Sequence, residues 1–108
     1  MNFSVIITFD LNYADSSDYR AVDRYLTDNG FEKLSSSGSK MPGNTYLGII
    51  DEKPGNPLGS DLLADAKKVK QSIYRKLKSV MTASGISSTV FVQVSPSDYT
   101  THSCSRPE

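Results

Sequence analysis

Asp10 is the residue of this sequence whose position points most directly to chemistry. It ends the apolar stretch SVIITFD, residues 4–10, which is typical of a buried strand. A carboxylate there could bind Mg²⁺ or Mn²⁺, because these ions prefer oxygen ligands and activate water for phosphodiester cleavage. One carboxylate per chain is too few for such a site, but a symmetric dimer would supply two. The alternative, which we favour, is that Asp10 and Asn12 accept N–H bonds in the turn that ends the strand.

Basic residues gather in residues 67–78, which contain six of the twelve Lys and Arg side chains. Clustered basic residues can contact the phosphates of a nucleic acid. The candidates that lie opposite the apolar stripe of the predicted helix are Lys67, Lys68, Arg75 and Lys78. Twelve acidic residues balance the twelve basic ones, so the chain has no overall attraction to nucleic acids or anionic membranes. We therefore expect a solvated helix face with weak, salt-sensitive nucleic-acid binding at most.

Nothing else in the sequence predicts a catalytic or cofactor site. The single cysteine, Cys104, excludes an intramolecular disulfide, and with His102 alone beside it a zinc site lacks ligands. A catalytic Cys/His pair would need a rigid scaffold, which a polar chain terminus does not provide. We expect no cofactor, or Mg²⁺ or Mn²⁺ if Asp10 is catalytic.

Length and composition predict one folded domain. The chain has 108 residues, 37% of them hydrophobic and 22% charged, which is ordinary for a globular protein. We expect this domain over residues 1–96 and a polar, flexible tail over 97–108. No apolar run reaches the roughly 18 residues of a membrane span, and residues 1–9 lack the features of a signal peptide. A cytoplasmic location is the expectation.

The hydrophobic pattern predicts four strands and two helices. Period-two alternation favours strands, and helix caps and a 3.6-residue apolar stripe favour helices. The predicted strands cover 3–9, 31–37, 45–51 and 88–94; the helices cover 16–28 and the segment between Asp61 and Gly85. Long loops are expected at 35–44 and 52–59. This β-α-β-β-α-β order is typical of the ferredoxin-like α+β fold, a four-stranded antiparallel sheet with both helices on one face.

The open face of the predicted sheet is the candidate interface. The side chains assigned to it by alternation are Ile6, Thr8, Tyr46, Ile50 and Phe91. An apolar open face marks a protein contact, and a two-fold axis makes one patch complementary to itself, so we expect a homodimer. An RNA-recognition motif is disfavoured, because the stretch TYLGIID, residues 45–51, has no basic residue and no Gly-aromatic-Gly pattern.

The first strand and helix also resemble a known group of proteins. The stretch VIITFDLN, residues 5–12, is similar to the opening of the small CRISPR adaptation protein, of the VapD-type toxin ribonucleases and of small phage-borne relatives that begin I-[ST]-[FY]-D-L-N. The stretch YRAVDRYLTDNGFEKLSSS resembles their first helix and the entry into the second strand. The resemblance implies a dimer in which the two Asp10 carboxylates meet near the two-fold axis and, in some members, bind a divalent metal. The long loop at 35–44, the insert at 52–59 and the polar tail depart from that pattern.

Two hypotheses of function follow. The first is a non-catalytic protein-interaction module, of phage or mobile-element origin, that binds and modulates a host complex as a homodimer. The alternative is a metal-dependent nuclease of the CRISPR adaptation or VapD type, with Asp10 of each protomer in the active site. The first strand has no second carboxylate, histidine or serine nucleophile near Asp10, which favours the first hypothesis.

Overall fold

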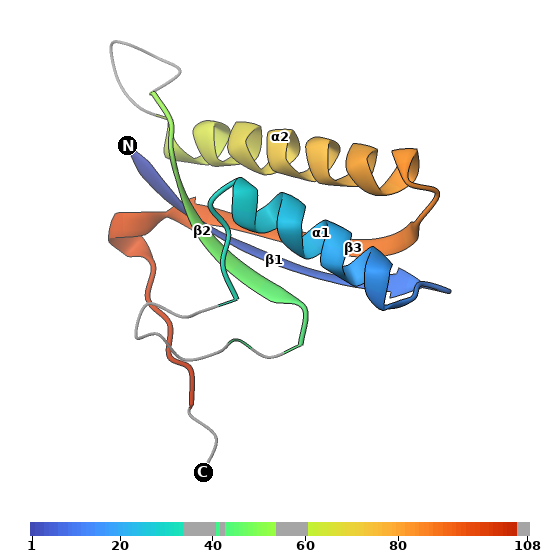
Figure 1. Cartoon of the computed structure of the whole chain (residues 1–108). Helices are drawn as coiled ribbons and strands as arrows, with labels where there is room; N and C mark the ends of the chain where they lie inside the picture. Colours follow the sequence, from blue (N-terminus) through green and yellow to red (C-terminus); the bar gives the residue numbers. More distant parts are fainter. Residues whose placement is uncertain (34–40, 42, 54–60, 106–108) are drawn as a thin grey trace.

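The described chain forms an α+β structure. The computed structural model describes residues 1–33, 41, 43–53 and 61–105. Along the chain lie β1 (Asn2–Asn12), α1 (Ser16–Asp28), β2 (Thr45–Asp51), α2 (Leu62–Ala83) and β3 (Ser87–Pro96), followed by one turn of 3-10 helix, η1 (Ser97–Tyr99). Figure 1 shows β1 running between the other two strands, with α1 and α2 over the sheet.

Over the described residues the sheet has three strands, and the expectation of a four-stranded ferredoxin-like sheet is wrong. The order is β2-β1-β3, with β1 antiparallel to both neighbours. From the strand predicted at 31–37, only an isolated bridge between Glu32 and Leu47 is present; residues 34–37 lie outside the described residues. In this bridge the backbone N–H of each residue donates to the carbonyl of the other, both at 2.8 Å.

The packing of Phe31 explains why the chain meets the sheet at this point. Phe31 is buried, and its ring lies against Gly48 in β2. A Cβ atom at Gly48 would overlap Cδ1 of the Phe31 ring, so this contact requires a glycine. The run that follows in the sequence, Ser35-Ser36-Ser37-Gly38-Ser39, offers no alternating apolar side chains with which to extend a strand.

The core lies on the side of the sheet that both helices cover. The odd-numbered residues of β1 from Phe3 to Leu11 are buried, since alternate strand residues face opposite sides of a sheet. The helices add their buried side chains to the same cluster: Val22 and Leu26 from α1, and Ala66, Val69, Leu77 and Met81 from α2. The apolar stripe predicted for the second helix consists of Leu62, Ala66, Val69, Ile73, Leu77 and Val80. Of these, Ala66, Val69, Ile73 and Leu77 pack in or against the core, and Met81 joins them.

The strand β2 turns the opposite face to the core from the one predicted. The register pairs Ile7 with Tyr46 and Phe3 with Ile50, so Tyr46 and Ile50 share the core side with the odd residues of β1. Tyr46 is only 1% exposed. The assignment of Tyr46 and Ile50 to the open face is wrong, and Leu47 and Ile49 take their place.

A hydrogen bond at the end of the Tyr46 side chain accounts for this orientation. Its hydroxyl donates to Oδ1 of Asp23 in α1 at 2.6 Å, and its ring stacks on Phe9 with centroids 5.9 Å apart. Burial, together with the hydrogen bond and the negative charge of Asp23, raises the pKa of the Tyr46 phenol well above its ordinary value of 10.0. The phenol therefore stays protonated and joins α1 to the sheet.

Replacing Tyr46 by phenylalanine is expected to lower the free energy of unfolding by about 1.5 kcal/mol, because a hydrogen bond to a carboxylate is lost. Tyr13→Phe is the control and should leave stability unchanged, since Tyr13 is fully exposed. Urea denaturation of both variants measures the difference. Equal stability of Tyr46→Phe and the wild type would show that this bond contributes nothing.

Helix α1 begins and ends where the sequence predicts. Asp15 is its N-cap and accepts the backbone N–H groups of Ser17 and Asp18, while the Asp18 side chain accepts the N–H of Asp15. The Asp15 carboxylate accepts hydrogen bonds from the Ser17 hydroxyl and from the backbone N–H of Asp18. These bonds lower the pKa of Asp15 below its ordinary value of 3.8. The cap therefore stabilises the helix fully above that ordinary pKa and is lost as the pH falls through the lowered value.

Candidate functional site

The face of the sheet that the helices leave open is the candidate site. Ile6 of β1 lies between Leu47 of β2 and Gln93 of β3, and Phe91 lies opposite Thr8. Ile49 is 63% exposed and Phe91 is 52% exposed. Three of the predicted interface residues, Ile6, Thr8 and Phe91, thus share this outer face, which also carries Leu47 and Ile49.

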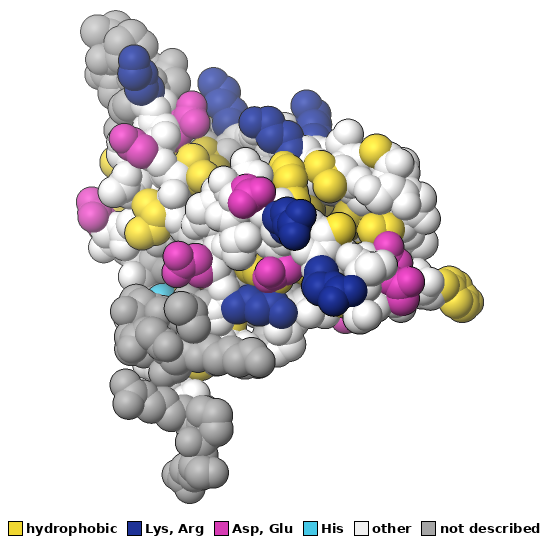
Figure 2. All heavy atoms as spheres, in the orientation of Figure 1, with side chains coloured by type: hydrophobic (Ala, Val, Ile, Leu, Met, Phe, Trp, Pro, Cys, Tyr) yellow, Lys and Arg dark blue, Asp and Glu magenta, His cyan; other side chains and the backbone are white. Residues whose placement is uncertain are grey.

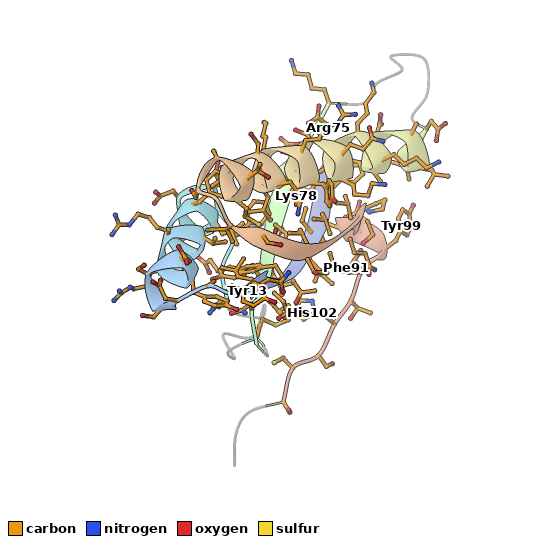
Figure 3. The ribbon with its side chains drawn as sticks, turned by 90° about the vertical axis from the view of Figure 1, so that its right-hand side faces the viewer. Tyr13, Arg75, Lys78, Phe91, Tyr99 and His102 are labelled. Carbon is orange, nitrogen blue, oxygen red and sulfur yellow. The ribbon has the colours of Figure 1, made fainter. Side chains whose placement is uncertain are left out.

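The segment that follows β3 makes the outer face concave. A groove of about 830 Å³ lies between the sheet and residues 97–102, with Gly30 and Glu32 also in its lining. The hydroxyls of Ser4 and Ser97 are 2.9 Å apart, and those of Ser95 and Thr100 are 2.6 Å apart. These bonds hold the start of the predicted tail beside the sheet. His102 lies in the same groove lining (Figure 3).

Asp10 does not end its strand, contrary to the structural hypothesis. Strand β1 continues to Asn12, and Asp10 pairs with Thr89 of β3 two residues before that end. The chain turns at Tyr13, whose φ is 55°. Asp10 is exposed on the outer face and makes no side-chain hydrogen bond or ion pair with another described residue. A turn-capping role for Asp10 is therefore wrong.

The described residues hold no cluster of three or more His, Cys, Asp or Glu side chains arranged to bind a metal ion. Asp10 is a single carboxylate, and its neighbours on the same face of the sheet are Thr8, Asn12 and Thr89, which add no second carboxylate. The described residues of one chain therefore do not complete a metal site at Asp10, and a second copy of the chain could supply further ligands. This is the arrangement that the resemblance of the first strand implies.

The predicted phosphate contacts do not form one free ridge. Lys67, Lys68 and Arg75 are exposed on α2. Lys78, however, is half-buried, and its Nζ donates to the carbonyl and the hydroxyl of Ser88 in β3, both at 3.0 Å. The prediction that Lys78 faces the solvent freely is wrong, because its aliphatic stem lets the ammonium group reach back over the sheet edge.

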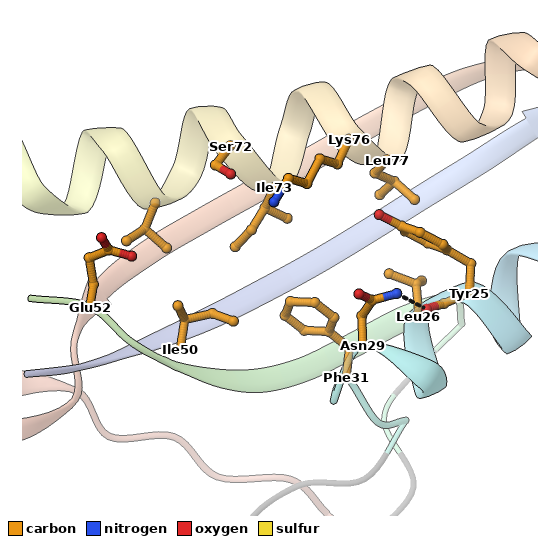
Figure 4. Close-up of a pocket in the computed structure, with 11 residues that line it drawn as sticks. Tyr25, Leu26, Asn29, Phe31, Ile50, Glu52, Ser72, Ile73, Lys76 and Leu77 are labelled. Atoms are coloured by element: carbon orange, nitrogen blue, oxygen red, sulfur yellow. Dashed lines mark hydrogen bonds between the residues drawn. The ribbon is translucent and has the colours of Figure 1, made fainter.

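A smaller cavity of about 190 Å³ lies between the end of α1 and the middle of α2 (Figure 4). Leu26, Phe31 and Leu77 are among its apolar lining residues, and Glu52 and Lys76 lie at its edge. Pockets that bind small molecules usually exceed about 300 Å³. This cavity is too small for that class of ligand.

Sequence reasoning missed Leu47 and Ile49 although it found the alternation of β2. Both sets of alternating side chains in this strand are apolar, so the pattern alone does not identify the buried set. Gly48 was an available signal, because a glycine inside a strand often marks the close approach of another segment. Gly48 belongs to the same face as Tyr46 and Ile50, and that face is the buried one.

Within the described part of the chain, no helix combines the length and the apolar character that crossing a membrane requires. The resemblance of the first strand to the CRISPR adaptation and VapD families stays a hypothesis. Comparison with known proteins gives no match to a family model, to a curated protein or to a solved structure.

Proposed function

We propose that this protein is a non-catalytic protein-interaction module that forms a homodimer through the outer face of its sheet. The observation that carries the proposal is the exposure of Ile49 and Phe91 on a face that no described helix covers. Apolar side chains gathered on an open sheet face are stabilised when a partner removes them from water. The groove beside residues 97–102 gives that face a recess for the side chains of the partner.

A second copy of the chain is the partner that this face suits best. In a two-fold dimer the same patch serves both protomers, so a mixture of apolar and hydroxyl side chains contacts the same mixture on the partner. The central pairs of this face are of this kind: Ile6 with Leu47, and Thr8 with Phe91. Each dimer would then present two copies of every other surface to a further protein.

The size of the face sets the expected affinity. Three strands about 4.8 Å apart, over a paired length of about 25 Å, cover roughly 400 Å². A standard stable interface buries about 800 Å² on each partner, so this dimer is expected to be weak, with a Kd in the micromolar range.

Amide chemical shifts recorded over a concentration series test where the contact lies. Dimerisation through the outer face should shift the amides of β1, β2 and β3 as the concentration rises, and leave the exposed face of α2 unchanged. Shifts confined to the helices would place the contact on the other side of the molecule and contradict the proposal.

The alternative, a metal-dependent nuclease, depends on Asp10, whose carboxylate lies on the same outer face. We expect Asp10→Asn to leave the melting temperature within about 1 °C of the wild type, because the exposed side chain has no partner to lose among the described residues. We also expect no stabilisation of the wild type by Mn²⁺ or Mg²⁺. Thermal unfolding with and without the metal measures both.

Two Asp10 carboxylates brought together in a dimer would repel unless a cation compensated them. A metal-dependent rise in melting temperature that disappears in Asp10→Asn, accompanied by nuclease activity that also disappears, would therefore establish the nuclease and replace the proposal.

A further inference from the structure

Strand β3 forms an edge of the sheet at which no described strand is paired. It is hydrogen-bonded to β1 on one side, and the strand order β2-β1-β3 leaves its other side free. The opposite edge of the sheet differs, because Glu32 bridges β2 there. A free edge offers backbone N–H and C=O groups to an added strand.

Side chains of this protein cap both ends of the β3 edge and leave its middle free. The Lys78 ammonium donates to the carbonyl of Ser88, and the Thr100 hydroxyl donates to the carbonyl of Pro96 at 2.8 Å. Alternate residues of a strand direct their backbone groups to the same side. The carbonyl and N–H groups of the even-numbered residues between these two caps, Val90, Val92 and Val94, therefore face the free side.

A groove runs along this edge between α2 and β3. Its volume is about 480 Å³, and its lining residues are Lys70, Gln71, Tyr74, Arg75, Val90, Phe91 and Val92. Figure 3 faces this side of the molecule and shows α2 above β3, with Arg75 on the helix and Phe91 on the strand. A strand added to β3 would lie in this groove, with one set of its side chains toward α2 and the other beside Phe91.

The charge of the groove is positive. Lys70 and Arg75 are both exposed, and no acidic residue is among those that line the groove. The ion pair present among the described residues joins the amino group of Met1 to Asp51, so Lys70 and Arg75 are not neutralised within that part of the chain. Figure 2 shows Lys and Arg side chains gathered along α2.

We propose that the β3 edge and α2 together bind an extended, acidic segment of a partner protein, which joins the sheet as an additional antiparallel strand. The backbone of the segment bonds to Val90 and Val92, and its carboxylates that face the helix meet Lys70 and Arg75. Strand addition of this kind takes affinity from main-chain bonds and specificity from alternate side chains. The proposal rests on the interaction role proposed above, but not on the dimer, which uses the outer face.

An acidic peptide suits this groove better than a nucleic acid. The phosphates of a nucleic acid would be attracted to Lys67 and Lys68 as well, and these residues are exposed on α2 outside the groove. Charge alone would therefore not direct a nucleic acid to the groove. Nucleic acids have no alternating N–H and C=O groups with which to pair an edge strand. The apolar walls supplied by Tyr74 and Val92 likewise suit the side chains of a peptide.

Fluorescence anisotropy with a labelled peptide of about eight residues, in which Glu alternates with Val and Thr, tests the proposal. The double variant Lys70→Glu and Arg75→Glu should weaken binding at least about tenfold. The control, Lys67→Glu and Lys68→Glu, carries the same change of charge outside the groove and should alter the affinity by less than about threefold. Absence of binding by the wild type, or equal loss in both variants, would overturn the proposal.

Methylation of the peptide nitrogens separates strand addition from simple charge attraction without changing the protein. In antiparallel pairing, the residues whose side chains face α2 direct their amides to β3. Methylation of the Glu amides should therefore abolish binding, and methylation of the Val and Thr amides should preserve it. Loss of binding by both methylated peptides, or by neither, would overturn strand addition. Displacement of the unmethylated peptide by a single-stranded oligonucleotide of equal charge would also overturn it.

Sedimentation of the same protein distinguishes the peptide site from the outer-face dimer, although Phe91 borders both surfaces. Peptide binding by a protein that sediments as a monomer would support this proposal while removing the dimer. Dimerisation without peptide binding would support the dimer and overturn the proposal of strand addition.

Discussion

Replacing Ile7 by alanine is expected to lower the free energy of unfolding by about 3 to 4 kcal/mol. Ile7 is fully buried in β1, the central strand, where it pairs with Tyr46 and Val92. Truncation removes apolar contacts and leaves a cavity, because the two neighbouring strands and the helices above restrict relaxation. Chemical denaturation measures the change.

The matched control is Ile6→Ala, the next residue of the same strand on the opposite face. Ile6 is only half-buried, so its truncation should cost about 1 to 2 kcal/mol, clearly less than that of Ile7, when measured on the monomer at low protein concentration. The comparison keeps residue type, strand and substitution the same and changes only the face. Equal losses would contradict the assignment of the two faces.

Replacing Phe91 by glutamate is expected to weaken the homodimer by more than about a hundredfold. The substitution places a charge without a partner in a contact from which water is removed, at a cost of about 3 kcal/mol or more. Ile49→Glu, on the far strand of the same face, should have the same effect. Light scattering over a range of concentrations measures the dissociation constant.

The control for this prediction is Tyr74→Glu, which puts the same charge on an exposed aromatic position of α2. Tyr74 is 43% exposed and lies on the helix side of β3, away from the outer face. Its substitution should leave the dimer intact. An intact dimer in both Phe91→Glu and Ile49→Glu would show that the outer face is not the contact.

Local signals in the sequence predicted the helices and one strand accurately. The caps at Asp15 and Asp61 and the turn at Gly85, whose φ is 73°, depend on hydrogen bonds and backbone conformations within a few residues. The strand predicted at 45–51 matches β2 for the same reason, since its alternation and its bounding turns are local.

The features that failed depend on contacts between distant segments. The buried face of β2 is decided by the bond between Tyr46 and Asp23 and by the ring of Phe31 over Gly48. The position of Lys78 depends on the edge of β3, which follows it in the sequence. None of these contacts follows from the local periodicity of the sequence.

The length of β1 illustrates the same limit at the candidate site. A carboxylate after an apolar run resembles a strand end, but pairing with β3 carries the strand past Asp10 to Asn12. That pairing depends on Ser87, Ser88 and Thr89, polar residues that the predicted strand only partly included. The sequence thus did not predict that Asp10 lies within a strand rather than at its end.

Sedimentation equilibrium of the wild-type protein, beside Phe91→Glu, tests self-association through the outer face. Over concentrations from about 1 to 200 µM, a dimer with a micromolar Kd gives an apparent mass that rises from 11.8 kDa toward twice that value. We expect this rise for the wild type, and we expect Phe91→Glu to stay close to the monomer mass up to about 10 µM, where the mass of the wild type has already risen. A wild-type protein that remains at 11.8 kDa over the whole range would contradict it.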